Sequence, residues 1–140
     1  MHMPPRILII EDQPTLAKNL KLYLGRLAAD VRVAADGEQA LALLDSFTPD
    51  AIVMDYGLPG MDGLTLYGEL VRRAGRPIEC IMTTGNSDLY LAQSIYSSGI
   101  RRIVCKPYSF LELTKLLQQC LSAADTSRLA SLAVASNEVA

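Results

Sequence analysis

The sequence lacks a hydrophobic run long enough to cross a membrane, and it lacks an excess of basic residues. No apolar stretch approaches the roughly 18 residues of a transmembrane helix, and the N-terminus has no signal-peptide pattern. The 13 lysines and arginines are balanced by 15 aspartates and glutamates, which gives a net charge of −2. We therefore expect a cytoplasmic protein that binds neither a membrane nor, directly, nucleic acid.

Cysteines are also scarce, and their spacing does not favour a metal site or a redox pair. Cys80, Cys105 and Cys120 are odd in number and contain no C-x-x-C motif. Cys80 and Cys105 lie inside short apolar runs that are typical of strands. We expect the cysteines to act as small buried hydrophobic residues in a reducing compartment.

What the sequence does contain is a repeated alternation of short apolar runs and amphipathic stretches. Its 140 residues, 50% hydrophobic and 20% charged, suffice for one domain with a single core. Each apolar run is followed by a stretch with helical periodicity, and the expected strands cover 6–10, 31–33, 51–55, 78–83 and 101–105. Five such units predict an α/β domain with a parallel sheet and helices on both of its faces.

Short polar side chains mark where the helices begin. Asp36, either Ser87 or Asp88, and Ser109 stand directly before helical periods and are expected N-caps. Asp62 precedes a helix that starts at Gly63, so we interpret it as a cap or turn acid and not as a metal ligand. In the helix expected over 87–98, the residues predicted to face inward are Ala92, Ile95 and Tyr96.

Reactive side chains follow four of the apolar runs. The central run, 51–55, ends at Asp55, and the others lead into Glu11 with Asp12, into Thr83 with Thr84, and into Lys106. Because parallel strands present their carboxyl ends at one edge of a sheet, these groups should converge there. Taken singly, each also has a plain explanation as a helix cap or a solvated loop residue.

The order and spacing of these motifs resemble a known family. Glu11-Asp12, Asp55 followed by Leu58-Pro59-Gly60-Met61-Asp62-Gly63, Thr84-Gly85 and Lys106-Pro107 look like the receiver domain of two-component response regulators, the class that includes the chemotaxis regulators. The resemblance covers residues 5–121 and implies a flavodoxin-like, three-layer α/β/α fold with strand order 2-1-3-4-5 and a cis Lys106–Pro107 bond. Residues 122–140, rich in Ala and Ser, are expected to be a tail or linker.

The resemblance also implies roles for the convergent residues. Asp55 corresponds to the phosphoacceptor and Asp12 to a direct ligand of Mg²⁺, with Mn²⁺ as a substitute. Glu11 would hold the ion through water, and the carbonyl of Gly57 would complete the protein's share of the site.

Two further residues would contact the phosphoryl group. Lys106 is expected to meet one phosphoryl oxygen with its ammonium and Thr84 another with its hydroxyl. Thr83 is the alternative hydroxyl.

The function implied by the resemblance is signalling. A sensor histidine kinase or a phosphotransfer protein would pass a phosphoryl group to Asp55 in a phosphorelay, and the domain would catalyse only its own phosphorylation and dephosphorylation. A surface near Tyr90, Ile103 and Tyr108 would then bind a downstream protein or a second copy, with the aromatic side chains as exposed anchors. Ile103 stands where the family carries its switch aromatic.

Other functions have less support from the sequence. The chain fits equally a lone receiver and a receiver whose output domain lies on a longer chain. An aspartate-nucleophile phosphatase would need a second acid where Gly57 stands. A flavin or nucleotide binder would need a glycine-rich loop after the first strand, and Glu11-Asp12-Gln13-Pro14 occupies that position.

Overall fold

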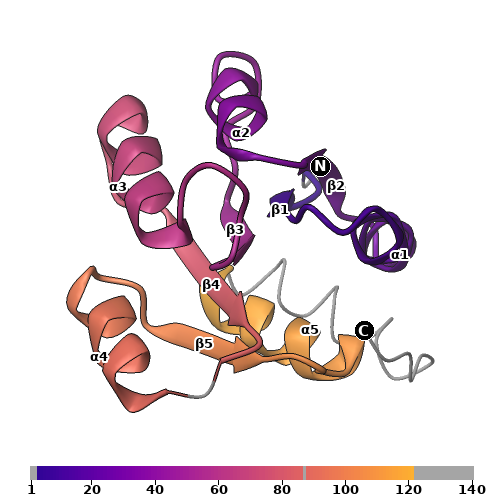
Figure 1. Cartoon of the computed structure of the whole chain (residues 1–140). Helices are drawn as coiled ribbons and strands as arrows, with labels where there is room; N and C mark the ends of the chain where they lie inside the picture. The colour runs from indigo at the N-terminus through magenta and orange to yellow at the C-terminus, as the bar shows by residue number, and fades with distance from the viewer. Residues whose placement is uncertain (1–2, 87, 122–140) are drawn as a thin grey trace.

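The computed structural model describes residues 3–86 and 88–121, so the expected tail, 122–140, lies outside the described residues. Five parallel strands form one sheet with the order β2-β1-β3-β4-β5, which confirms the predicted topology. The strands are β1 (Arg6–Ile10), β2 (Asp30–Ala34), β3 (Ala51–Asp55), β4 (Glu79–Thr84) and β5 (Arg102–Cys105) (Figure 1).

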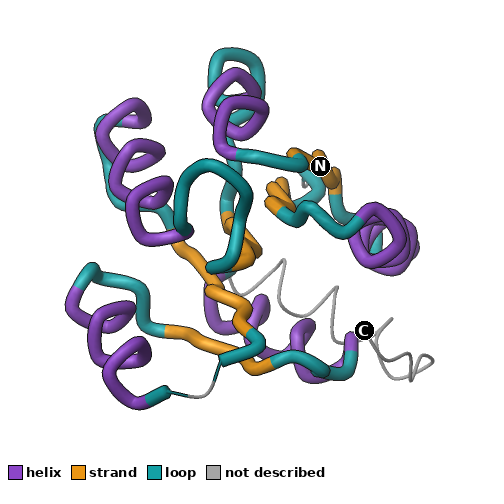
Figure 2. The backbone as a smooth tube through the Cα atoms, in the orientation of Figure 1, coloured by secondary structure: helices purple, strands orange, loops and turns teal. Residues whose placement is uncertain are grey.

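One helix follows each strand. The helices are α1 (Pro14–Arg26), α2 (Gly37–Leu43), α3 (Gly63–Ala74), α4 (Leu89–Ser97) and α5 (Phe110–Cys120). Helices α1 and α5 cover one face of the sheet, and α2, α3 and α4 cover the other (Figure 2). The fold is therefore the predicted α/β/α sandwich. None of these described helices has both the length and the apolar character needed to span a membrane.

Strand alternation produces two separate cores, one on each face. Ile7 and Ile9 of β1 pack with α1 and α5, whereas Leu8 and Ile10 pack with α2, α3 and α4. All five residues of β3 are buried, as expected for the central strand of a sheet covered on both sides. Asp55 is the last of these five residues, so its position is fixed by buried neighbours.

The predicted helix caps are confirmed. The side chains of Asp36, Asp62, Asp88 and Ser109 each accept a hydrogen bond, at 2.8 to 3.0 Å, from a backbone N–H two or three residues later. Of the two candidates for α4, Asp88 is the cap; Ser87 lies outside the described residues. Asp62 is thus an N-cap, as interpreted from the sequence.

Three expected side-chain environments are wrong. Cys105 is exposed, because it is the last residue of the edge strand β5, whereas Cys80 is buried as predicted. Tyr96 is 55% exposed, because α4 lies over the edge of the sheet and buries only Ile95. Tyr108 is only 2% exposed, because it joins the core between α1 and α5, so it is no surface anchor.

Candidate functional site

Asp55 lies at the carboxyl end of β3 in a largely dry position. Its side chain is 11% exposed, and the backbone N–H of Gly57 donates to Oδ1 at 3.2 Å. An anion buried to this extent is stable only with a cation or further donors nearby. The surroundings of Asp55 supply them.

Gly63, the first residue of α3, lets this helix approach the end of β3 closely. A Cβ at Gly63 would lie 3.0 Å from Cα of Tyr56, 3.1 Å from the carbonyl oxygen of Asp55 and 2.9 Å from the sulfur of Met82. Two of these atoms belong to the backbone and have little freedom to move. Only a residue without a side chain therefore lets α3 begin this close to the backbone of Asp55.

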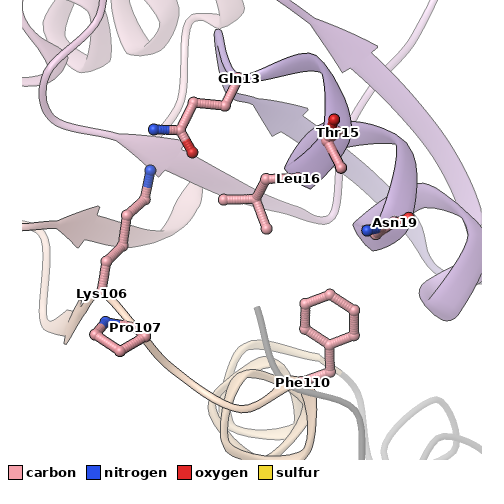
Figure 3. A pocket seen from close by; sticks show the side chains of 7 residues that line it. All are labelled: Gln13, Thr15, Leu16, Asn19, Lys106, Pro107 and Phe110. Atoms are coloured by element: carbon pink, nitrogen blue, oxygen red, sulfur yellow. The ribbon is translucent and has the colours of Figure 1, made fainter.

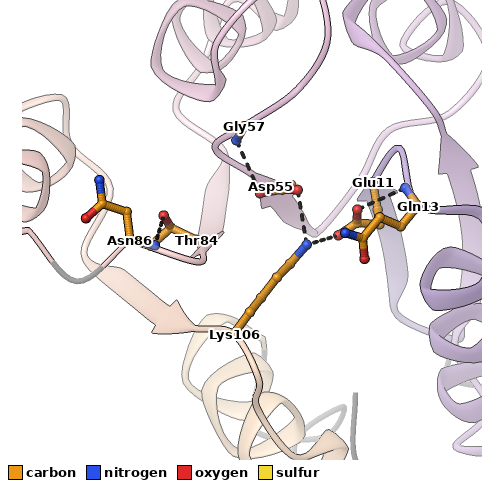
Figure 4. A network of polar contacts seen from close by, with 7 residues as sticks. All are labelled: Glu11, Gln13, Asp55, Gly57, Thr84, Asn86 and Lys106. Carbon is orange, nitrogen blue, oxygen red and sulfur yellow. Dashed lines mark hydrogen bonds and ion pairs between the residues drawn. The ribbon is translucent and has the colours of Figure 1, made fainter.

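Lys106, which follows β5, bridges the acids at the carboxyl ends of β1 and β3. Its Nζ donates to Oε1 of Glu11 at 2.8 Å and to Oδ2 of Asp55 at 3.1 Å (Figure 4). The Lys106–Pro107 peptide bond is cis, as the resemblance implied. The backbone N–H of Lys106 donates to the carbonyl oxygen of Thr84 at 2.8 Å, which links the lysine to the end of β4.

Burial and the bonds between Glu11 and Lys106 shift the pKa of each residue in opposite directions. Glu11 is 3% exposed, and its pKa is raised, chiefly by burial and also by the charge of Asp55, although the bonds from Lys106 and the Gln13 N–H act to lower it. Burial alone would lower the pKa of Lys106, but its bonds to Glu11 and Asp55 raise it. Lys106 is therefore a firmly charged cation between two acids.

Glu11, Asp12 and Asp55 together have the donor set of a divalent cation site. One carboxylate oxygen from each lies within 4.8 Å of the others, and Asp12 is exposed where the other two are buried. Carboxylate oxygens suit Mg²⁺, which prefers oxygen ligands and keeps several of its waters, and the exposure of Asp12 leaves one side of the group open to solvent. The residues present therefore fit this ion.

Thr84 lies at the rim of the site and is turned toward the next loop. Its hydroxyl oxygen accepts a hydrogen bond from the Asn86 N–H at 3.0 Å, and the Asn86 side chain accepts one from the Asp88 N–H at 2.9 Å (Figure 4). Thr83 is buried beside Asp55 in the sheet register. The structure thus gathers the acids and the lysine, whereas the hydroxyl of Thr84, at the end of β4, is bonded to the loop that leads to α4.

Two pockets that the sequence did not predict border the site. A pocket of about 470 Å³ opens beside Lys106, between α1 and α5 (Figure 3), and is lined by Gln13, Thr15, Leu16, Asn19, Lys106, Pro107 and Phe110. A smaller pocket of about 100 Å³ lies under α4, with Thr84, Ile95, Ile103 and Cys105 among its lining residues. Pockets depend on how helices pack, which a hydrophobic pattern does not specify.

A parallel sheet of this order, with three acids and a lysine at its carboxyl edge, defines a receiver-type α/β protein. The family model for the response regulator receiver domain matches residues 7–118. The chain belongs to this family and is a receiver domain of two-component response regulators.

Curated relatives support the same assignment. The chain is 35% identical over 111 residues to the DNA-binding response regulator MtrA of Mycolicibacterium smegmatis, covering 79% of this chain and 48% of that protein. It is 35% identical over 117 residues to the transcriptional regulatory protein BaeR of Escherichia coli, covering 84% of this chain and 48% of BaeR. The chain thus spans about half the length of these relatives.

Solved structures share the fold over nearly their whole length. The signal receiver domain of an HD domain-containing protein from Pseudomonas fluorescens is 31% identical with a TM-score of 0.76, covering 91% of this chain and 98% of that one. The response regulator TrrA from Thermotoga maritima, in complex with Mg²⁺ and BeF, is 28% identical with a TM-score of 0.72, covering 84% and 99%.

Proposed function

We propose that Asp55 accepts a phosphoryl group from the phosphohistidine of a sensor histidine kinase or phosphotransfer protein. The observation that carries this proposal is the buried pairing of Lys106 with both Glu11 and Asp55, beside a third acid, Asp12. Such an arrangement puts one nucleophilic carboxylate among groups that offset charge on a phosphoryl group.

In the proposed reaction, a carboxylate oxygen of Asp55 forms a bond to phosphorus while the bond from phosphorus to the histidine nitrogen breaks. Electrons of the broken bond stay on the imidazole, so no oxidant or reductant takes part. Lys106 is already within hydrogen-bond distance of Asp55, at 3.1 Å, and would meet an oxygen of the transferred group. The same site would later let water hydrolyse the acyl phosphate, and we assign no other catalysis to the domain.

Bound Mg²⁺ would neutralise charge on the phosphoryl oxygens. Asp12 and Asp55 would hold the ion directly, Glu11 through water, and the Gly57 carbonyl would be a further ligand. Glu11 would have to exchange part of its bond to Lys106 for this role, because Lys106 now occupies one of its oxygens at 2.8 Å. The three acids repel one another, so they need a nearby cation both without Mg²⁺, when Lys106 supplies it, and with Mg²⁺ bound.

The output step in this proposal begins at Thr84. A phosphoryl oxygen at Asp55 would attract the Thr84 hydroxyl away from Asn86, and so shift the loop that Asp88 connects to α4. We place the switched surface on α4 and β5, around Tyr90 and Ile103.

The boundaries 5–121, the linker role of 122–140 and the cytoplasmic location remain predictions. So does the expectation that this chain itself does not bind nucleic acid, since the relatives named above include a DNA-binding regulator of which the matched residues cover 48%.

Intact-mass measurement after incubation with a small phosphodonor and Mg²⁺ tests the proposal. We expect one adduct, labile to base as an acyl phosphate is, and none in Asp55→Asn. Asp12→Asn is the companion variant, since it should weaken metal binding strongly and leave the nucleophile in place. An adduct that persists in Asp55→Asn, or a wild-type protein that accepts no phosphoryl group from any donor or kinase, contradicts the proposal.

A further inference from the structure

Two tyrosine hydroxyls are buried in the core between the sheet and helices α1 and α5. Tyr23 on α1 is 1% exposed, and Tyr108, in the segment before α5, is 2% exposed. Neither hydroxyl is hydrogen-bonded to any described residue, and no other described side chain has a buried polar atom without a partner. An unpaired buried hydroxyl destabilises a fold, so each of the two calls for an explanation.

Tyr108 shares a face of the sheet with the acids of the site. Alternate residues of a strand point to the same face, so Asp55 lies on the side of Val53, and Glu11, directly after β1, on the side of Ile9. Val53, Ile9 and Tyr108 belong to one core. Burial raises the pKa of the Tyr108 phenol, and the charges of Glu11 and Asp55 raise it further. The phenol is therefore a protonated hydrogen-bond donor close to two anions.

Glu11 is the acid that would need a further donor during the proposed reaction. One of its carboxylate oxygens accepts from Lys106 at 2.8 Å and the other from the Gln13 N–H at 3.1 Å (Figure 4). When Lys106 turns to an oxygen of the transferred phosphoryl group, Glu11 loses the stronger of these bonds. A carboxylate this deeply buried is destabilised by such a loss unless another donor takes the place of the lysine.

We propose that the Tyr108 hydroxyl is this replacement donor, which makes Tyr108 a positioning residue for Glu11. When Lys106 moves to the phosphoryl group, the Tyr108 O–H donates to the freed carboxylate oxygen and keeps Glu11 oriented toward the site. Tyr108 is the second residue after Lys106, so one shift of this segment acts on both side chains. Because the hydroxyl is unpaired beforehand and paired afterwards, it favours the phosphorylated state.

The inference rests on the proposed function, because it concerns the state in which Asp55 carries a phosphoryl group. Beryllofluoride with Mg²⁺ mimics that state at equilibrium. Tyr23 offers a matched control, since its hydroxyl is also buried and unpaired among the described residues. It lies near the C-terminal end of α1, about 14 Å along the helix from Pro14 at the site.

Titration of the full chain with beryllofluoride at saturating Mg²⁺ tests the inference in wild type, Tyr108→Phe and Tyr23→Phe. We expect the dissociation constant to rise about tenfold or more in Tyr108→Phe, as for the loss of a hydrogen bond to a charged acceptor, and to change less than about twofold in Tyr23→Phe. Without the analogue, urea titration should find both variants at least as stable as the wild type, because each change removes an unpaired hydroxyl.

The NMR signal of the tyrosine Cζ atom gives a second readout, because it responds to hydrogen bonding of the phenol. The signal that is missing in Tyr108→Phe should shift when wild type binds the analogue, and the signal that is missing in Tyr23→Phe should not. A Tyr108→Phe protein that binds as tightly as wild type, an equal loss in Tyr23→Phe, or an unshifted Tyr108 signal overturns the inference and leaves the proposed function standing. A wild type that neither binds the analogue nor accepts a phosphoryl group, read by mass, overturns both.

Discussion

Helices α4 and α5 lie on opposite faces of the sheet beside the same edge strand, β5, but they are anchored very differently (Figure 1). Helix α5 buries Phe110, Leu113, Thr114 and Leu117. Helix α4 buries one residue, Ile95, over a pocket. The edge of the domain is thus firm on one face and loosely packed on the other.

The difference separates the chemical part of the site from the part that can move. The Lys106 side chain, in the segment before α5, donates to Glu11 and Asp55, whereas the hydroxyl of Thr84, at the end of β4, accepts from the Asn86 N–H of the loop before α4. The bonds to Glu11 and Asp55 and the buried residues of α5 hold Lys106 in place. Weakly packed elements are the ones that move in a conformational switch, so we assign the response to α4.

The largest effect should come from shortening an anchor of α5. Leu113→Ala removes a fully buried leucine and should lower the free energy of unfolding by about 2–5 kcal/mol. Ile95→Ala in α4 should cost an amount at the low end of that range, because α4 can detach locally before the domain unfolds. Urea titration of both variants measures this; equal costs would mean that α4 is as firmly held as α5.

A smaller effect is expected where α3 meets the site. Gly63→Ala forces a methyl group against the backbone of Tyr56 and Asp55, and should destabilise the domain by about 1–3 kcal/mol while weakening Mg²⁺ binding. Gly68→Ala, in the same helix with open space around it, should instead stabilise by about 0.5–1 kcal/mol. Urea titration and metal titration of the pair separate the close approach from helix propensity.

The smallest effect concerns Tyr67, an anchor of α3. Its hydroxyl donates to the Ile78 carbonyl at 2.9 Å, so Tyr67→Phe should cost about 1 kcal/mol. Burial raises the pKa of Tyr67 above its ordinary value of 10.0. The folded protein therefore keeps the phenol of Tyr67 protonated to a higher pH than the unfolded chain does. The stability that the protonated phenol confers is present below pH 10 and is lost as the pH rises above 10.

Measuring the free energy of unfolding of both proteins from pH 8 upward checks this. The difference between wild type and Tyr67→Phe should shrink above pH 10. A difference that stays constant would show that the phenol ionises as readily in the folded state as in the unfolded one.

Much of the fold was predictable, because local patterns specify it. Apolar runs such as Ile7–Ile10 and short polar caps such as Asp36 act within a few residues, and the structure confirms both. The convergence of Glu11, Asp55 and Lys106 followed from parallel strands alone. Strand order and the cis peptide bond required the family resemblance, since periodicity does not encode them.

What the sequence did not predict depends on contacts between distant segments. The pattern indicated an inner face for α4 but not that an edge position would leave Tyr96 exposed. Tyr108 follows Lys106-Pro107 in a loop, and only the packing of α1 against α5 shows that it is buried. The pairing of Lys106 with Glu11, 95 residues away, has no local signal either.

The central claim is that phosphorylation at Asp55, beside the well-anchored Lys106, changes the position of the weakly packed helix α4. Amide hydrogen exchange with and without beryllofluoride and Mg²⁺ tests this claim most directly. We predict that bound analogue changes exchange in the Thr84 loop and α4, that α5 stays as protected as before, and that Lys106→Ala binds the analogue without changing exchange in α4. Unchanged exchange in α4 of the wild type with the analogue bound, or an equal change in α5, would contradict the account.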